Sequence, residues 1–228
     1  MVLNAALSSL ALAEGSTHAH TGAWVAAVLR ARIAEGQLLP GAKLSEQVIS
    51  VELGVSRNTL REAFGVLDQE LIITRIPNRG VFVASPGADG VREIYAVRRM
   101  IEPAAVLWGP KQDVAALAAI IVDARAALDA GDIAKMADAN QCFHQELVAS
   151  TGSIHLQELM GKVLAQMRLV FHSMVDAPDF HSHYVQLNAG LVELLQAGDR
   201  EQAAESLRGY LDRAEAELLE HLEDEEIS

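Results

Sequence analysis

Residues 53–69 read Leu-Gly-Val-Ser-Arg-Asn-Thr-Leu-Arg-Glu-Ala-Phe-Gly-Val-Leu-Asp-Gln, and residues 77–83 read Pro-Asn-Arg-Gly-Val-Phe-Val. Ser56 is a favourable N-cap, so the first segment predicts a helix that starts there and reaches about residue 69. Its apolar residues recur at the helical period and predict a buried face. Two arginines and an asparagine share the opposite face: Arg57, Asn58 and Arg61.

Short elements flank this helix on both sides. The expected elements are helices at 21–35 and 45–53, turns at 39–41 and 77–80, and strands at 71–76 and 81–84. Gly36 and Gly54 are placed to end the two helices. Two helices joined by a glycine turn and followed by a β-hairpin predict a winged helix-turn-helix domain over residues 21–85.

The rest of the chain follows a helical period. Residues 85–87 read Ser-Pro-Gly, which favours a linker between two domains. The helices expected after it lie at 89–108, 113–130, 132–151, 154–175, 180–197 and 199–223. Six antiparallel helices in an all-α bundle over residues 86–228 are the simplest assembly, so the fold class is mostly α. We expect residues 1–20 to form a disordered N-terminal arm, and the acidic end of the chain to be frayed.

The net charge of −13 is divided unevenly along the 228 residues. Residues 22–85 hold seven Lys and Arg against six Asp and Glu, whereas residues 86–228 hold eleven against twenty-four. Acidic segments repel phosphate, so we expect any contact with nucleic acid in the first part alone. The single cysteine, Cys142, excludes an internal disulfide and fits a reducing cytosol. No apolar run approaches the roughly 18 residues of a membrane span, so we expect a cytoplasmic protein without a membrane partner.

The outward side chains of the helix expected at 56–69 and of the hairpin that follows it suit double-stranded DNA. Arginine matches the guanine edge with two hydrogen bonds, and asparagine suits adenine or phosphate. The hydroxyls of Ser56 and Thr59 can donate to phosphate oxygens. Arg79, at a hairpin tip with Gly80, can reach the minor groove or the backbone. The alternative is a surface helix whose arginines are only solvated or paired, for example Arg61 with Glu62 or with acidic residues on other elements.

The sequence resembles the GntR family of bacterial winged-helix repressors. The segments that carry the resemblance are Gly36-Gln-Leu-Leu-Pro-Gly-Ala-Lys-Leu-Ser-Glu and the two segments at 53–64 and 77–83. Ile94-Tyr-Ala-Val-Arg-Arg-Met-Ile-Glu-Pro-Ala-Ala and Cys142-Phe-His-Gln-Glu-Leu are similar to its FadR-type branch, whose effector domain is called FCD. The resemblance covers nearly the whole chain from about residue 22. One departure is Glu70, where the family usually has glycine before the first wing strand.

The resemblance implies a homodimeric transcription factor, expected to be a repressor, that binds a short inverted repeat. It also implies control by a small metabolite bound in the helical domain. By position, the resemblance assigns DNA contact to Ser56, Arg57, Asn58, Thr59, Arg61, Arg79 and Gly80. Gln47 stands where some members place a contacting arginine.

Many FCD domains hold a divalent metal with an aspartate, a histidine four residues later, and two histidines on the last two helices. The matching positions here are Asn140, His144, Asn188 and Tyr210. Amides and a neutral tyrosine are weak ligands for transition metals, so His144 is the one ligand that remains. We therefore expect no metal or other cofactor. The four side chains are instead expected to form a ring of hydrogen-bonding groups that binds an organic effector directly.

Arg98 matches an arginine in the family's first effector helix. It is expected to pair with a carboxylate or phosphate of the effector, and a carboxylate-bearing metabolite is the expected ligand class. The alternative for Arg98 is a bridge to Glu102, four residues further on. The alternative for His144 is a core histidine with satisfied hydrogen bonds.

Two other functional readings stay open. One is a DNA-bound dimer that has lost its response to metal and effector. The other is a metal-assisted enzyme that uses His144. The chain shows no nucleophile elbow, no phosphate-cradling glycine loop and no acid–base pair beside an intact metal set, so we expect no enzyme. The histidine pairs at 18 and 20 and at 181 and 183 are expected to be exposed rather than metal ligands.

Overall fold

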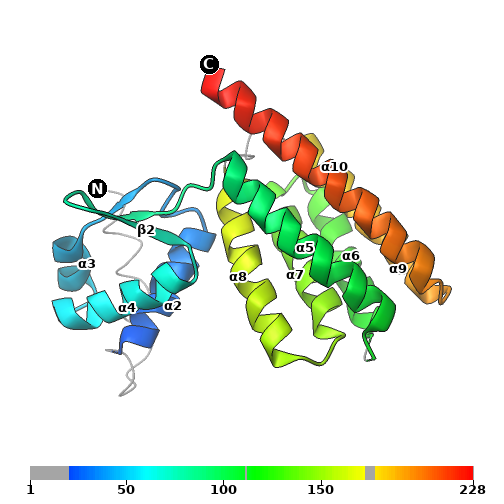
Figure 1. The fold of residues 1–228 in the computed structure, drawn as a ribbon, viewed down its shortest axis with the longest axis horizontal. Helices are drawn as coiled ribbons and strands as arrows, with labels where there is room; N and C mark the ends of the chain where they lie inside the picture. The colour runs from blue at the N-terminus through cyan, green and yellow to red at the C-terminus, as the bar shows by residue number, and fades with distance from the viewer. Residues whose placement is uncertain (1–20, 111, 173–177, 228) are drawn as a thin grey trace. The chain divides into compact units, whose positions relative to one another are not determined.

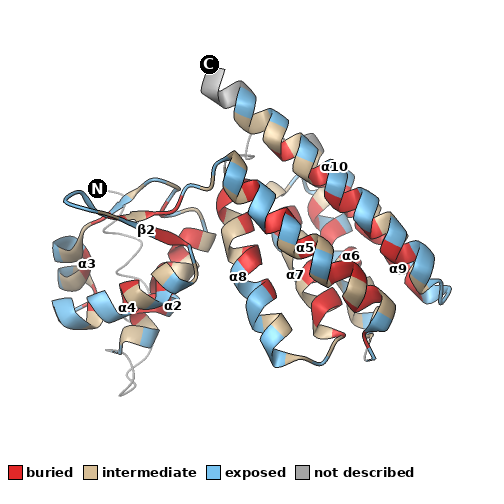
Figure 2. Ribbon diagram, viewed as in Figure 1, coloured by how far each residue is buried: buried red, intermediate tan, exposed pale blue. Residues whose placement is uncertain are grey.

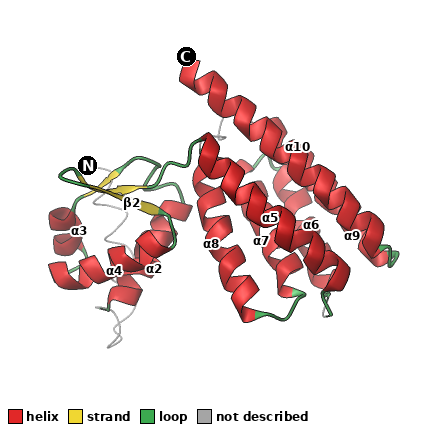
Figure 3. Ribbon diagram, viewed as in Figure 1, coloured by secondary structure: helices red, strands yellow, loops and turns green. Residues whose placement is uncertain are grey.

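The computed structural model describes residues 21–110, 112–172 and 178–227. The chain divides into two compact units, residues 1–85 and 86–228, and the division falls within the Ser-Pro-Gly segment. The arm expected at residues 1–20 lies outside the described residues. Helices dominate the fold, and a small sheet belongs to the first unit (Figure 3). The predicted fold class is therefore confirmed.

The first unit contains three described helices and a three-stranded antiparallel sheet in the order β1-β3-β2. The elements are α2 (Gly22–Ala34), β1 (Lys43–Leu44), α3 (Glu46–Glu52), α4 (Arg57–Gln69), β2 (Ile73–Ile76) and β3 (Gly80–Val83). Helix α2 packs against α4 through fully or nearly fully buried apolar side chains: Val25, Leu29, Ile33, Leu60, Phe64 and Leu67. This packing fixes α4 on the core and leaves its polar face in solvent (Figure 2).

Two details of this unit differ from the sequence-based expectation. Strand β1 was not predicted, because two residues are too few to show a period; Lys43 pairs with Phe82 and Leu44 with Val81. The left-handed backbone before the first wing strand falls at Leu71, with φ of 59°, and not at Glu70, whose φ is −86°. Glu70 therefore replaces glycine without backbone strain, and the conformational cost of the left-handed backbone lies at Leu71.

The second unit is a helical bundle. Its helices are α5 (Ala88–Trp108), α6 (Val114–Asp129), α7 (Ile133–Ala149), α8 (Ile154–Phe171), α9 (Pro178–Gln196) and α10 (Arg200–Ile227). Asp113, Asp132 and Ser153 cap the starts of α6, α7 and α8, because their side chains accept a backbone N–H three residues on. Helix α10 lies along α5, while α6 packs against α7 and α9 (Figure 1).

Helix α10 continues to Ile227, beyond the end at residue 223 that the sequence predicted. Leu218 is fully buried, and Leu222 packs against the main core of the bundle. This apolar packing anchors α10 as far as Leu222. None of the helices in the described part of the chain is long and apolar enough to cross a membrane.

Candidate functional site

The start of α4 has the geometry expected of a DNA-reading helix. The Ser56 hydroxyl accepts the backbone N–H of Thr59 at 3.1 Å and lies 2.8 Å from the Thr59 hydroxyl, so it caps the helix. Arg57, Asn58 and Arg61 are all exposed on one face. The opposite face is buried against α2. The amphipathic helix therefore presents the predicted polar side chains outward because its apolar side must pack on the core.

Two of these side chains are held by carboxylates. Arg61 forms an ion pair with Glu46 at the start of α3, with Nη2 and Oε2 3.3 Å apart. The Asn58 amide donates to Glu62 at 3.0 Å. The alternative of a paired arginine is thus seen for Arg61, whose partner is Glu46, an acid on another element, and not Glu62. Exposed pairs of this kind are weak, typically about 0.2–1 kcal/mol, so DNA phosphates or bases can displace them.

The wing is a tight hairpin between β2 and β3, with Ile76 paired to Gly80. Asn78 and Gly80 have φ of 61° and 114°, which allows the chain to reverse within residues 77–79. The guanidinium of Arg79 lies 5.9 Å from the centre of the Phe82 ring, and Lys43 approaches the same ring at 5.8 Å. Lys43 was not predicted as a site residue, because the strand that carries it was not predicted.

Ion pairing divides the cations of the first unit into two groups. Four arginines of residues 21–85 pair with carboxylates: Arg30, Arg32, Arg61 and Arg75. Within the same residues, Lys43, Arg57 and Arg79 form no ion pair, and all three are exposed. The uncompensated positive charge therefore lies at the start of α4 and on the wing. Gln47 is exposed on α3, the helix that precedes α4 in the sequence.

The second unit contains a buried polar cluster that joins four helices. Arg98 of α5 donates Nε–H to Glu102 at 2.6 Å, and the other oxygen of Glu102 lies 2.6 Å from Nδ1 of His144 on α7. Nε2 of His144 lies 2.9 Å from the Tyr210 hydroxyl on α10. All four side chains are at most 4% exposed. The cluster is therefore part of the core of the bundle.

Two amides complete the cluster. The Tyr210 hydroxyl lies 3.0 Å from Oδ1 of Asn140, and the Asn188 amide donates to the same oxygen at 2.7 Å. The structure thus brings together the five residues predicted for the effector pocket, and it adds Glu102 at their centre. Sequence reasoning named Glu102 only as an alternative partner of Arg98, and the i,i+4 spacing was the available signal.

Electrostatics set the protonation of the cluster. Burial alone raises the pKa of Glu102, but the charge of Arg98 and the contact with His144 outweigh it and lower that pKa to about 2. Burial lowers the pKa of His144, although Glu102 opposes this effect. Glu102 is therefore ionised and His144 neutral near pH 7. Burial also raises the pKa of Tyr95, whose ring lies 4.9 Å from the Arg98 guanidinium, to about 12.

The hydrogen bonds of the cluster are incompletely satisfied. An ionised Glu102 accepts the Nδ1–H of His144, so Nε2 of a neutral His144 is an acceptor. The single Tyr210 proton then faces two acceptors, His144 Nε2 and Asn140 Oδ1. In addition, Nη2 of Arg98 and Oδ1 of Asn188 are buried without a hydrogen-bond partner. Each such atom costs about 1–3 kcal/mol, and the two offer one donor and one acceptor to a ligand.

The cluster does not fit a transition metal. Both nitrogens of His144 are engaged, by Glu102 and by Tyr210, and Glu102 is held by Arg98. Asn140 and Asn188 bond to each other. Among the described residues, no three His, Cys, Asp or Glu side chains are placed to hold a metal ion. The donor set is therefore one for hydrogen bonding rather than for metal ligation.

The other histidines differ in burial. His183 is exposed, as expected, but His181 is buried at 4% exposure and packs edge-on against Phe171 and Phe180. The expectation that both are exposed is therefore wrong for His181, because helix α9 points that side chain toward the aromatic rings of the core. Burial lowers the pKa of His181 to about 4. The pair at 18 and 20 lies outside the described residues.

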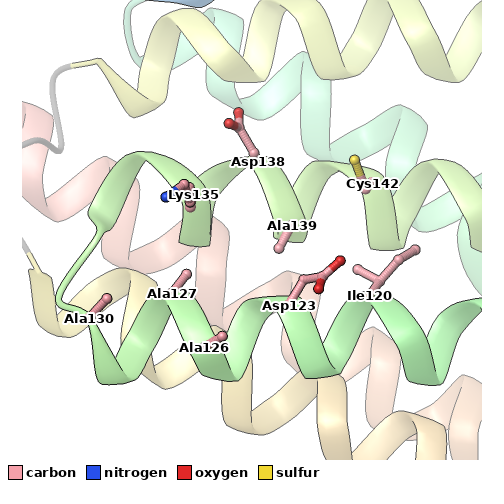
Figure 4. Close-up of a pocket in the computed structure, with 9 residues that line it drawn as sticks. All are labelled: Ile120, Asp123, Ala126, Ala127, Ala130, Lys135, Asp138, Ala139 and Cys142. Atoms are coloured by element: carbon pink, nitrogen blue, oxygen red, sulfur yellow. The ribbon is translucent and has the colours of Figure 1, made fainter.

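A separate open pocket of about 470 Å³ lies between α6 and α7 (Figure 4). Alanines form much of its wall, and Asp123, Lys135, Asp138 and Cys142 border it. Lys135 pairs with Asp132 at the start of its own helix. None of the predicted site residues lines this pocket, so it is distinct from the polar cluster.

Comparisons with known proteins match both units. The gntR family of bacterial regulatory proteins matches residues 21–83, and the FCD domain matches residues 93–223. A solved structure described as a putative transcriptional regulator GntR from Rhodococcus sp. RHA1 is 38% identical, with a TM-score of 0.82. The similarity covers 87% of this chain and 97% of that one.

Curated relatives are similar over shorter or more divergent stretches. The gluconate operon transcriptional repressor of Bacillus subtilis (strain 168) is 40% identical over 90 residues, which is 40% of this chain and 37% of that protein. The match thus spans little more than a third of that relative's length. The uncharacterized HTH-type transcriptional regulator BphR of Paraburkholderia xenovorans (strain LB400) is 26% identical over 81% of this chain and 79% of its own length.

Proposed function

Because the chain belongs to the GntR family of bacterial regulatory proteins and carries an FCD domain, we propose that it is a transcriptional repressor controlled by a small organic acid. It binds a short inverted-repeat operator as a homodimer. The first unit reads the DNA, and the polar cluster of the second unit binds the effector. The observation that carries the proposal is the placement of uncompensated cations at the start of α4 and on the wing.

Each DNA-facing residue has a defined role in this proposal. Arg57 and Arg61 contact base edges in the major groove, and Asn58 contacts adenine or phosphate. The helix start with Ser56 and Thr59 approaches a phosphate, where the helix dipole favours negative charge. Arg79 and Gly80 carry the wing to the neighbouring backbone or minor groove. Gln47, on α3, is placed to add a phosphate or base contact.

DNA binding is tested with a duplex that the purified protein selects from a random pool. Fluorescence anisotropy then compares the wild type with Arg57→Ala and Arg61→Ala. Loss of a base-contacting arginine removes about 1–3 kcal/mol, so each variant is expected to bind about 10- to 100-fold more weakly. Arg125→Ala is the matched control, because Arg125 is an exposed arginine on α6 of the other unit. If Arg57→Ala and Arg61→Ala both bind like the wild type, the assignment of α4 as the reading helix is wrong.

The effector site rests on the two buried atoms without partners. Arg98 Nη2 can donate to a ligand carboxylate, and Asn188 Oδ1 can accept from a ligand hydroxyl. A hydroxy acid supplies both groups in one small molecule. A relative is named for a gluconate operon, and gluconate is such an acid, so sugar acids belong in the first panel tested.

Thermal-shift measurements with a panel of carboxylates and sugar acids test the effector proposal. A ligand that binds the cluster raises the melting temperature of the wild type but not that of Asn188→Leu, which removes the acceptor. The pairing of Arg98 with Glu102 supports a second candidate function, a constitutive DNA-bound dimer. In this candidate Glu102 takes the place of an effector carboxylate on the Arg98 guanidinium. No shift with any acid, together with operator affinity that no acid changes, would favour that candidate.

A further inference from the structure

The sheet of the first unit turns one face to solvent. Strand pairing places Lys43 of β1 and Thr74 of β2 directly opposite Phe82 of β3, so the three side chains lie on the same side of the sheet. Lys43 and Thr74 are exposed, and Phe82 is half-buried. Their neighbours along the strands, Leu44 and Val81, point to the other side and are buried. The side that carries Lys43 is therefore a surface that a ligand can reach.

An aromatic ring on this surface carries two cations. The Lys43 ammonium lies 5.8 Å from the centre of the Phe82 ring, and the Arg79 guanidinium lies 5.9 Å from the same point. Both distances are within the range of a cation–π contact. Such a contact orients a cation without neutralising it, whereas a carboxylate would cancel its charge. Phe82 therefore holds two positive charges on one small area of the surface.

The glycine at position 80 leaves room for the Lys43 side chain at the tip of the wing. A Cβ on Gly80 would lie 3.3 Å from Cε and 3.9 Å from Nζ of Lys43. Gly80 pairs with Ile76 at the end of the hairpin, beyond Phe82 along the sheet. The lysine stem thus crosses the bare backbone of Gly80, and its ammonium lies at the same end of the sheet as Arg79.

The protein leaves both of these cations without a counter-charge. Among the described residues, no carboxylate forms an ion pair with Lys43 or Arg79, whereas Arg75 on the neighbouring strand β2 pairs with Asp68 at 3.4 Å. Two like charges held close together repel each other, so the pair is stabilised when an anion binds beside them. The surface belongs to the same unit as α4, and the phosphate backbone of DNA supplies such an anion.

We propose that Lys43 is a further DNA contact of this chain, and that Lys43 and Arg79 form a two-cation clamp on the phosphate backbone that Phe82 positions. The inference rests on the proposed function, because it assigns another contact to the unit that reads the DNA. Lys43 lies outside both α4 and the β2–β3 hairpin. Phosphate contacts fix the orientation of a protein on the duplex and carry no sequence information, so the clamp anchors the wing while α4 reads the bases.

The dependence of binding on salt measures this contact. Each phosphate that a cation neutralises adds about 0.9 to the steepness with which log K falls against the logarithm of the salt concentration. Lys43→Met keeps the stem of the side chain and removes its charge, so we expect the steepness for the full chain on its selected duplex to fall by about 0.9. Between about 50 and 200 mM KCl, the wild type should therefore lose about 3.5-fold more affinity than Lys43→Met. Lys43→Arg keeps the charge and should keep the salt dependence.

Arg75→Met is the matched control. It removes one positive charge from the same sheet, but Asp68 already neutralises that charge, so we expect a steepness within about 0.3 of that of the wild type. An unrelated duplex of the same length separates a backbone contact from a base contact. Lys43→Met should weaken the binding of the selected and the unrelated duplex by the same factor, because the lost contact does not depend on sequence. Circular dichroism shows that each variant compared is folded.

A double-mutant cycle tests the positioning role of Phe82. Phe82→Leu removes the ring and is expected to weaken DNA binding about threefold. In a chain that already carries Lys43→Met and Arg79→Met, the same change should leave binding unaltered, because no cation remains to be positioned. A purely structural effect of Phe82→Leu would persist in that chain and would overturn the positioning role. Phe82→Tyr keeps the ring and should bind like the wild type.

The outcomes separate this inference from the proposed function. If the wild type binds its duplex and Lys43→Met keeps the wild-type affinity and salt dependence, the inference is overturned, while the proposed function stands. The inference also fails if Arg75→Met lowers the salt dependence as much as Lys43→Met, because net charge then explains both results. A different duplex selected by Lys43→Met indicates a base contact and overturns the phosphate clamp. A wild type that selects no duplex overturns the proposed function and this inference together.

Discussion

The pair of Arg98 and Glu102 provides the sharpest test of the buried polar cluster. Their side chains are 1% and 0% exposed, and the carboxylate also bonds to His144. Glu102→Gln keeps the size of the side chain but removes its charge. The guanidinium of Arg98 is then buried without a counter-charge, and we expect the second unit to lose much of its stability.

The magnitude follows from the ionisation of Glu102. Its pKa falls from an ordinary 4.5 to about 2, because Arg98 and His144 outweigh the opposing effect of burial. At about 1.36 kcal/mol per pKa unit, the ionised carboxylate contributes roughly 3 kcal/mol to the free energy of unfolding. Breaking a buried pair from one side costs about 3–5 kcal/mol in other proteins, which is the same order.

The sign of the pH dependence is fixed by the direction of the pKa change. A carboxyl group with a lowered pKa stabilises the fold fully above its unfolded value, near pH 4.5, and this stabilisation is lost as the pH falls toward 2. We therefore expect the difference between the wild type and Glu102→Gln to be largest at neutral pH. It should shrink between about pH 4.5 and the acid end of the folded range.

Urea unfolding followed by circular dichroism at several pH values measures this difference. The double variant Arg98→Met with Glu102→Leu is the control, because replacing both charges by apolar groups is expected to cost much less than replacing one. The reasoning is refuted if Glu102→Gln unfolds within about 1 kcal/mol of the wild type at pH 7. It is also refuted if the double variant is as unstable as the single one.

Three further results are expected. Ser56→Ala removes the cap of α4 and should lower the free energy of unfolding of the first unit by about 1 kcal/mol in urea, whereas an unchanged midpoint argues against the cap. Leu71→Gly relieves a left-handed backbone with φ of 59° and should raise that free energy by up to about 1 kcal/mol; a clear loss of stability contradicts this reading. Dialysis against a chelator should leave the melting temperature unchanged, because the partners of His144 do not form a metal site; about one equivalent of Zn, Ni or Mn that is lost together with stability shows the reverse.

Local signals explain why the first unit was predictable. The cap at Ser56, the glycine turn and the apolar period of α4 act within about one helical turn of each other, so the sequence displays them directly. What it does not display is β1, since a two-residue strand exists only through its pairing with β3. Strand β1 carries Lys43, so only the structure reveals that Lys43 lies with the cations of the wing.

The second unit shows the opposite balance. Helical period and caps predicted its helices, and the resemblance pointed to five of the six residues in the polar cluster. The role of Glu102 was left open between two readings of Arg98. Its position between Arg98 and His144 depends on a contact between helices whose residues are 42 positions apart. No pattern along α5 alone reveals that contact.

The sequence by itself determined the helices and the exposed polar face of α4, because these follow from residue type and short-range spacing. The family resemblance added the expectation that two amides and a tyrosine stand at three of the four positions where many FCD domains hold metal ligands. The tertiary structure alone decided that Glu102 forms an ion pair with Arg98, that His181 is buried, and that Trp108 and Met100 stay exposed. Those properties depend on which helices face one another. Burial and ion pairing are set by packing between segments that are distant in the sequence. An apolar residue in the sequence of a helix therefore does not reveal whether another segment of the chain covers its side chain.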